Sequence, residues 1–206
     1  ASNQFNLDTF KENPDKLIPF FSINPMFEEN LEEMEKCIKL GAKGVGEIHA
    51  SIQGLALDDK NLWNDALKLL QENSLPIIMH ASEPVGHLYP GKGSSYTQNI
   101  YKFIKLFPEN KIILAHWGGG LLFYELMNEV KDVSKNVYYD TAASSFLYNS
   151  KIFEIAIEIV GSEKIIFGSD FPILSPERIL NEMKNLKEKD LINITEKNIK
   201  NILNLN

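Results

Sequence analysis

The chain has 206 residues, of which 44% are hydrophobic and 24% charged, as is typical of one soluble globular domain with a sizeable core. The formal net charge of −7 argues against a nucleic acid as the main partner. A single cysteine, Cys37, excludes an internal disulfide framework, and no stretch approaches the roughly 18 apolar residues that span a membrane. Because no signal-peptide pattern is present, we expect a cytoplasmic protein without a membrane partner.

Apolar runs and amphipathic stretches alternate along the chain. Residues 1–13 are polar without a clear period, and no element is predicted there. Buried strands are predicted over residues 17–23, 44–49, 75–80, 111–116, 136–141 and 164–170. Helices are predicted over residues 27–40, 58–73, 99–107, 121–133, 151–160 and 177–187, with a last helix near Thr195. Strands without polar alternation, separated by helices, indicate a parallel α/β sheet.

Four of the predicted strands carry a histidine or a carboxylate at their carboxyl ends. Taken alone, such a residue is more simply a helix cap or a hydrogen-bonded core group. A set of four is different, because a buried carboxylate is costly unless it is paired or bound to a cation. His, Asp and Glu are ligands that suit zinc, manganese or iron. The residues are Glu47 with His49 on the same face of its strand, His80, His116 and Asp170.

One site built from several strand ends favours a closed barrel, because an open sheet would spread those ends along a line. A (β/α)8 barrel of the TIM-barrel type has eight strands and about 250 residues, whereas six strands are predicted here. We therefore expect an α/β fold of this type that lacks its first two βα units, in one domain over residues 1–206. Truncation, cleavage or disorder would each explain the difference. Open edges at 17–23 and 164–170 would favour self-association as a homo-oligomer.

Five stretches resemble the amidohydrolase superfamily, in particular the amidohydrolase-related group that includes enzymes of the aminocarboxymuconate-semialdehyde decarboxylase type. They occur in the order that the family shows and together cover nearly all of the chain. The stretches are GAKGVGEIH at 41–49, LPIIMH at 75–80, ILAHWGGG at 113–120, YYDT at 138–141 and IFGSDFP at 166–172.

The resemblance implies a divalent metal, with zinc expected first and manganese or iron as alternatives. His80 would be a metal ligand, His116 a second ligand or a substrate-polarising group, and Asp170 a ligand and general base. Glu47 stands where decarboxylase-like members often have Lys. It would be either a bridging carboxylate, as in the two-metal branches, or a hydrogen-bond acceptor for the His80 imidazole.

The family's His-x-His pair on the first strand has no counterpart among the four histidines of this chain. We therefore expect the metal site to be incomplete here. Weak or absent metal binding and no activity are predicted for the 206 residues alone, while the parent protein should bind metal.

Other candidates for substrate contact lie beside the predicted ligands. The loop at 83–93 is long for a βα connection, and such loops often act as lids, although its prolines would also explain a merely solvated loop. His87 and Lys92 in this loop, together with His49 and Trp117, are predicted to face the substrate; Trp117 could equally pack in the barrel. The three glycines after His116 would form either an anion-binding helix start or a tight turn.

Three functions are considered for a small-molecule substrate. The first is a metal-dependent hydrolase, in which the metal lowers the pKa of a bound water toward about 7 and Asp170 takes its proton. The second is a metal-dependent decarboxylase of an aromatic or unsaturated carboxylic acid, which release of CO2 would reveal. The third is a binding protein that has lost the metal site.

Overall fold

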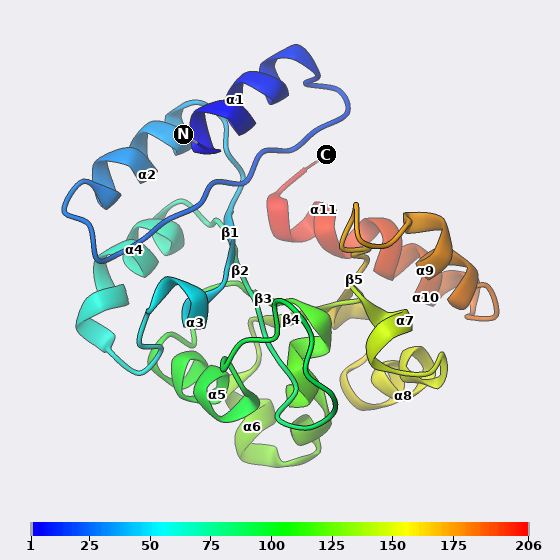
Figure 1. The fold of residues 1–206 in the computed structure, drawn as a ribbon. Coiled ribbons are helices and arrows are strands. Elements are labelled where there is room, and N and C mark those ends of the chain that lie inside the picture. Colours follow the sequence, from blue (N-terminus) through cyan, green and yellow to red (C-terminus); the bar gives the residue numbers. More distant parts are fainter. Residues whose placement is uncertain (1, 206) are drawn as a thin grey trace.

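The computed structural model describes residues 2–205 as a parallel sheet with helices around it (Figure 1). The five strands pair in chain order, and every pairing is parallel. Their carboxyl ends therefore lie along one rim, as the sequence predicts. The strands are β1 (Val45–Ile48), β2 (Ile77–Met79), β3 (Ile112–Leu114), β4 (Val137–Asp140) and β5 (Ile165–Ile166).

Helices connect the strands and cover the outer face of the sheet (Figure 1). The early helices are α1 (Ser2–Glu12), α2 (Asn30–Lys39), α3 (Ala50–Gln53), α4 (Lys60–Glu72) and α5 (Thr97–Leu106). The middle ones are η1 (His116–Leu126), α6 (Asn128–Val133), α7 (Ser144–Leu147), α8 (Lys151–Val160) and η2 (Ser162–Lys164). The last are α9 (Pro176–Glu182), α10 (Glu188–Ile192), η3 (Asn193–Lys197) and α11 (Asn198–Leu203). Within residues 2–205, no helix is long and apolar enough to cross a membrane.

The helix α4 shows how local sequence sets these elements. Asp59 caps its start, because the Asp59 carboxylate accepts hydrogen bonds from the backbone N–H groups of Asn61 at 3.0 Å and Leu62 at 3.2 Å. The helix then buries one apolar face, which includes Trp63 and Leu70, against the sheet. Capping and periodicity agree here, and the helix predicted over 58–73 is found.

The two faces of the sheet belong to different parts of the core. Outward side chains such as Met79 and Leu114 pack with the surrounding helices in the main cluster. Inward side chains, among them Ile113, form a second cluster that Ile202 and Leu203 of α11 complete. The Nζ of Lys111, just before β3, donates to the Ile202 carbonyl at 2.9 Å. The last helix therefore covers the inner face near the amino ends of the strands, away from the rim that carries the predicted ligands.

The start of the chain departs from the prediction. Residues 1–13 were expected to form no element, but Ser2–Glu12 is the helix α1. Its contacts explain it better than its pattern does: Leu7 is fully buried, and the side-chain amide of Asn3 bonds to both backbone groups of Ser22. Tertiary contact thus overrides a sequence with little helical period.

The first predicted strand, 17–23, is reduced to a single bridge between Phe21 and Val45. The Phe21 N–H donates to Gly44 O at 3.1 Å and Phe21 O accepts from Gly46 N–H at 2.9 Å. Pro19 has no N–H to extend this ladder. The segment lies along β1 in the predicted position, but most of it is not strand.

Residues 121–133 do not form one helix. The backbone φ is positive from His116 to Gly120, so these residues cannot belong to a right-handed helix. The chain then makes a short 3-10 segment, becomes extended at Met127, and only α6 is α-helical. The strand predicted over 164–170 is likewise shorter, since only Ile165–Ile166 pairs with β4.

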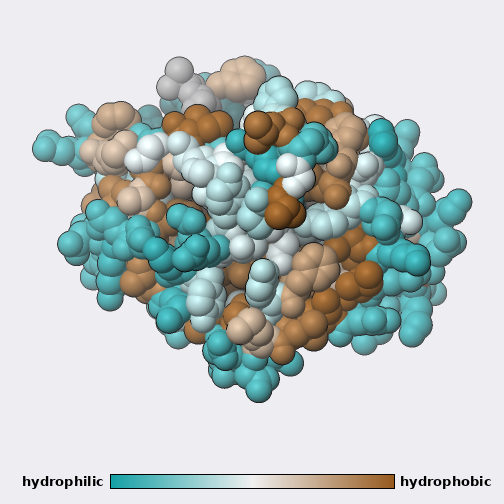
Figure 2. All heavy atoms as spheres, turned by 60° about the horizontal axis from the view of Figure 1, so that its bottom comes forward, coloured by the Kyte–Doolittle hydropathy of each residue, from teal (hydrophilic) through white to brown (hydrophobic). Residues whose placement is uncertain are grey.

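The molecular surface is mixed in character. Figure 2 shows one face on which hydrophilic residues crowd the two sides and apolar residues reach the surface between them. Several large apolar side chains of the chain are at least half exposed: Phe5, Met26, Phe27, Ile52, Val85, Leu88, Tyr124, Leu126, Phe146, Phe171 and Ile173.

Candidate metal centre

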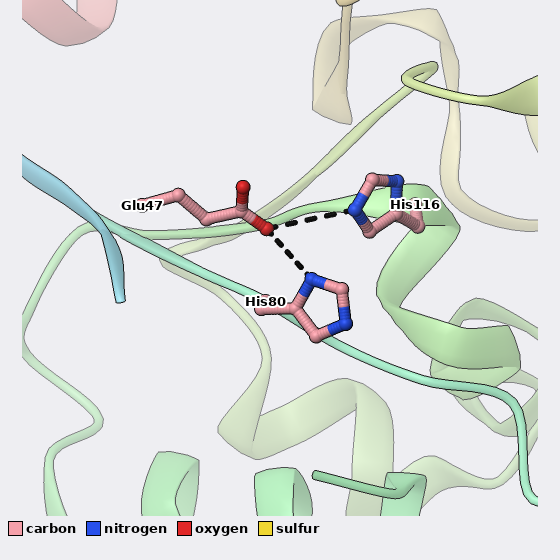
Figure 3. A group of neighbouring side chains, drawn as sticks. All are labelled: Glu47, His80 and His116. Carbon is pink, nitrogen blue, oxygen red and sulfur yellow. Dashed lines mark hydrogen bonds and ion pairs between the residues drawn. The ribbon is translucent and has the colours of Figure 1, made fainter. Parts of the chain in front are cut away.

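Three side chains from adjacent strands meet at the carboxyl rim of the sheet (Figure 3). Glu47 belongs to β1, His80 directly follows β2, and His116 lies two residues after the end of β3, at the start of η1. One ligand atom from each lies within 4.8 Å of the other two. Glu47 Oε1 is 2.9 Å from His80 Nδ1 and 3.5 Å from His116 Nε2, so one carboxylate oxygen faces both imidazoles.

The protonation of this group follows from its contacts. Burial alone would raise the pKa of Glu47, but hydrogen bonds and charge from His116 and His80 hold it well below the usual carboxyl range. Burial opposes protonation of His116, yet the bond to Glu47 and the charge of Asp140 raise the pKa of His116 to about 9. In the absence of a metal, the pair is therefore a carboxylate and an imidazolium.

The donor set fits a divalent metal. Two ligands on a tetrahedral ion, each about 2.1 Å from it, lie about 3.4 Å apart. The Glu47–His80 and Glu47–His116 distances of 2.9 Å and 3.5 Å are close to that spacing. One carboxylate and two imidazoles suit zinc, manganese or iron. A cation would also balance the Glu47 charge that the His116 proton balances in its absence.

The two histidines of the group are held by neighbouring residues. His80 Nε2 lies 3.1 Å from the Ser82 hydroxyl. The His116 backbone N–H donates to Asp140 Oδ1 at 2.9 Å, and its Nδ1 donates to the Ala142 carbonyl at 3.3 Å. Because Nδ1 is occupied, Nε2 is the nitrogen that His116 presents to Glu47.

His49 lies beside the group and has other partners. Its ring stacks on that of His80, with centroids 3.9 Å apart and planes inclined by 14°. His49 Nε2 donates to Gly91 O at 2.9 Å, and the Ser51 hydroxyl is 3.3 Å from Nδ1. Both ring nitrogens are thus engaged, and His49 joins the metal group to the loop after β2.

The glycine turn after His116 is closely packed. A Cβ on Gly119 would lie 2.5 Å from Ser82 O, and one on Gly118 would lie 2.9 Å from the Tyr139 ring. The three glycines are buried, and their positive φ places them outside any right-handed helix. Of the two expectations for this segment, the tight turn agrees with the backbone, and no α-helix starts there.

A cavity of about 640 Å3 opens in front of the metal group. Asp170 lines it, with the backbone in the left-handed region at a φ of 68°. His49 and His87 also line it, as predicted for substrate contacts, although contact with a substrate remains a prediction. The wall also includes the mainly apolar residues Tyr89, Pro90, Phe146, Leu147 and Ile173.

Two predicted contact residues lie outside the cavity lining. Lys92 turns into its own loop, where its Nζ donates to Val85 O at 2.7 Å and lies 3.6 Å from Glu83 Oε2. Trp117 is fully buried and donates to the Ser144 hydroxyl at 2.7 Å. Neither side chain is presented to the cavity in this conformation.

Sequence reasoning missed Asp140 as a site residue. Burial raises the pKa of Asp140 to about 6, although the His116 charge and two backbone N–H groups favour its ionised form. It ends a strand, so the rule that singled out His80 and His116 also points to it. The cavity residues Phe146 and Ile173 follow irregular segments and carry no comparable signal.

Comparison with known proteins agrees with the resemblance that the sequence motifs indicate. The family model described as Amidohydrolase matches residues 1–206. A curated relative, 2-amino-3-carboxymuconate-6-semialdehyde decarboxylase of Caenorhabditis elegans, is 23% identical over 255 aligned residues, covering 92% of this chain and 62% of the relative. The chain therefore spans less than two thirds of that relative.

Solved structures agree in fold. The 5-carboxyvanillate decarboxylase of Sphingomonas paucimobilis matches with a TM-score of 0.80 and 15% identity, over 99% of this chain and 71% of the other. A dihydroxybenzoic acid decarboxylase of Polaromonas, with bound manganese and the inhibitor 2-nitroresorcinol, matches with a TM-score of 0.77 and 19% identity, over 98% and 74%. A TIM-barrel protein of Bordetella bronchiseptica matches at 0.73 and 18%, over 98% and 72%. The predicted barrel-type fold, with fewer strands than the closed form, is confirmed.

Proposed function

The chain belongs to the amidohydrolase family, and from this membership we propose that it is part of a metal-dependent decarboxylase acting on an aromatic or unsaturated carboxylic acid. The observation that carries the proposal is the convergence of Glu47, His80 and His116 at the mouth of a cavity. Support for a decarboxylase comes from the relatives, which are named as decarboxylases. The hydrolase that sequence reasoning placed first has less support, because more of the similar proteins are named as decarboxylases than as hydrolases.

We assign Glu47, His80 and His116 as metal ligands, with Asp170, which also lines the cavity, as a further ligand or proton carrier. Manganese, expected from the sequence as an alternative to zinc, has the support of a similar structure that contains it. When bound, such a metal would act as a Lewis acid on a substrate oxygen.

The cavity suits a small, partly apolar acid. Its volume of about 640 Å3 lies within the range of about 300–1,000 Å3 that is usual for small-molecule sites. Phe146, Leu147 and Ile173 supply apolar wall, while the metal group and Asp170 supply charge. A ring would face the apolar wall and its carboxylate the metal group.

Loss of CO2 leaves an electron pair on the carbon that carried the carboxylate, and a proton must reach that carbon. We assign this step to Asp170, which lines the cavity near His116. The C–C bond breaks, CO2 leaves, and the new C–H bond forms with a proton from solvent water that Asp170 passes to the carbon.

The test uses the full-length protein with a panel of aromatic and unsaturated carboxylic acids labelled with 13C in the carboxyl group. We expect labelled CO2 that disappears after chelation of the metal and returns with manganese or zinc. His80→Ala should slow release about 100-fold or more, because a Lewis acid contributes several kcal/mol to the barrier.

Glu72→Gln is the matched control, since this carboxylate is exposed on α4, and its rate should equal that of the wild type. Hydrolysis products without CO2 would instead favour the hydrolase. An undiminished rate in metal-free protein would contradict both metal-dependent functions.

A further inference from the structure

The strand β4 supplies no member of the metal group, but its carboxyl end touches the segments on both sides. Asp140, the last residue of β4, accepts two hydrogen bonds on the same oxygen. One comes from the His116 backbone N–H at 2.9 Å, and the other comes from the Ala142 N–H, also at 2.9 Å.

These two bonds act on opposite ends of the same histidine. The Asp140 carboxylate fixes the His116 backbone directly. It also fixes Ala142, whose carbonyl oxygen accepts the proton of His116 Nδ1 at 3.3 Å. The Asp140 carboxylate therefore fixes the backbone of His116 directly and its ring through Ala142. His116 Nε2 remains facing Glu47 at 3.5 Å.

His116 needs such support because its backbone is unfavourable. Its φ of 57° lies in the left-handed region, which is unfavourable for a residue with a Cβ. Trp117 has the same φ, so two consecutive residues with a Cβ adopt this unfavourable conformation. Without an acceptor for the His116 N–H, this conformation would lose a main-chain hydrogen bond as well.

Thr141, the first residue after β4, holds the neighbouring segment on the other side. The buried Thr141 hydroxyl donates to Gly168 O at 2.8 Å and accepts from Gly168 N–H at 3.0 Å. Gly168 precedes Asp170 by two residues. A Cβ on Gly168 would lie 3.3 Å from the Asp140 carboxyl carbon, so the segments are in close contact. The end of β4 is thus fastened to the residues before Asp170 as well as to His116.

We propose that Asp140 is a positioning residue of the metal centre, which holds His116 so that Nε2 points to the metal. The inference rests on the proposed function, because it takes His116 to be a ligand. It also adds a role for the strand that lies between the two ligand-bearing segments.

The experiment measures zinc affinity of the full-length protein by competition with a chromogenic chelator. Asp140→Ala should weaken zinc binding by about 10- to 100-fold, the usual effect of losing a group that orients a ligand. Asp140→Asn keeps an oxygen that can accept both N–H groups, and its affinity should lie within about threefold of the wild type.

Asn198→Ala separates positioning from general loss of stability. Asn198 donates to Ser162 O and Ile165 O, both at 2.7 Å, away from the metal group. This variant should unfold more easily but bind zinc as the wild type does. If Asp140→Ala does not fold, Asp140→Ser replaces it, because a single short hydroxyl cannot take over both contacts, and it too should bind zinc more weakly.

The outcomes are distinct. Folded Asp140→Ala protein that binds zinc within threefold of the wild type would overturn the inference and leave the metal site intact. Equal weakening by Asn198→Ala would also overturn it, since stability alone would then account for the effect. A wild type that binds no zinc or manganese would overturn the proposed function, and the inference with it.

Discussion

Gly119 occupies a point where two main chains touch. Its φ of 57° favours glycine, and a Cβ there would lie 2.5 Å from Ser82 O. Ser82 in turn contacts His80 through its hydroxyl. The packing of this turn therefore affects the position of His80 through the Ser82 backbone, which has little freedom to move.

We predict that Gly119→Ala destabilises the protein more than Gly54→Ala does. Gly54 has a similar φ of 70°, but a Cβ there would meet nothing within 4 Å. Gly54→Ala should cost about 1–2 kcal/mol for the backbone alone. Gly119→Ala should cost about 1–3 kcal/mol more for the overlap. Urea unfolding of both variants measures the difference, and equal losses would mean that the contact with Ser82 is easily relaxed.

Single residues were predictable from the sequence where chemistry and chain position coincide. His80 and His116 each follow an apolar run, Glu47 lies near the end of a third strand, and strand ends converge, so their meeting could be foreseen. Lys92 could not be placed in this way. Its position depends on the conformation of a loop whose own carbonyl groups compete for the ammonium, and no sequence period reports that conformation.

At the level of elements, a buried ion pair ties η1 to η2, immediately before β5. Lys164 Nζ lies 2.6 Å and 2.8 Å from the two carboxylate oxygens of Glu125 and donates to Ser134 O at 2.7 Å. The Tyr139 hydroxyl also donates to Glu125, at 2.7 Å. The Glu125 side chain is only 2% exposed, so its charge depends on these partners.

We predict that Lys164→Met lowers the free energy of unfolding by about 3–5 kcal/mol, because it leaves a buried carboxylate without its cation. Chemical denaturation at neutral pH measures this loss. The double variant Lys164→Met with Glu125→Leu should recover most of the stability, since no charge then remains buried. A small effect of the single variant would indicate that water reaches Glu125 when Lys164 is absent.

Elements with a strong period and a cap were predictable, as α4 and the strands β1 to β4 illustrate. The segment at 121–133 was not, because the apolar run there continues through a turn whose handedness is set by contacts with Tyr139 and Ser82. Helix α1 was missed for the opposite reason. Its sequence is polar, and its stability comes from docking through Leu7 and Asn3.

Across the whole molecule, both margins of the sheet are covered by asparagine side chains. Beside the segment that pairs with β1, Asn3 Oδ1 accepts from Ser22 N–H at 2.7 Å and its Nδ2 donates to Ser22 O at 3.0 Å. Beside β5, Asn198 donates to Ile165 O at 2.7 Å. Backbone groups that would pair with another strand are occupied in this way. Self-association through these margins remains a prediction from the sequence, and this cover should weaken it.

We predict that Asn3→Ala increases self-association of the 206-residue chain, because it frees the N–H and C=O of Ser22 for pairing with a second copy. Sedimentation velocity over a range of protein concentrations measures the change. Gln4→Ala is the control, since among residues 2–205 the Gln4 side chain bonds only to Asp8 within α1, at 2.9 Å. Identical sedimentation of Asn3→Ala and wild type would show that another surface governs association.

The barrel type and the order of its strands could be predicted because they follow from alternation and parallel pairing. The way the inner face is covered could not, because it depends on where the chain folds back after the last strand. Ile202 and Leu203 look like any amphipathic helix in sequence. Only the structure places them against Ile113 and Ile166 inside the sheet.

Because α11 lies at the amino ends of the strands, the two ends of the sheet have different roles. Lys111 and the apolar residues of α11 hold the amino ends of the strands, whereas Glu47, His80 and His116 occupy the carboxyl ends. Substitutions at the amino ends could therefore raise thermal stability without changing the metal group at the carboxyl ends. The same separation would let the two ends drift at different speeds in evolution, the apolar end by exchange among similar side chains and the polar end hardly at all.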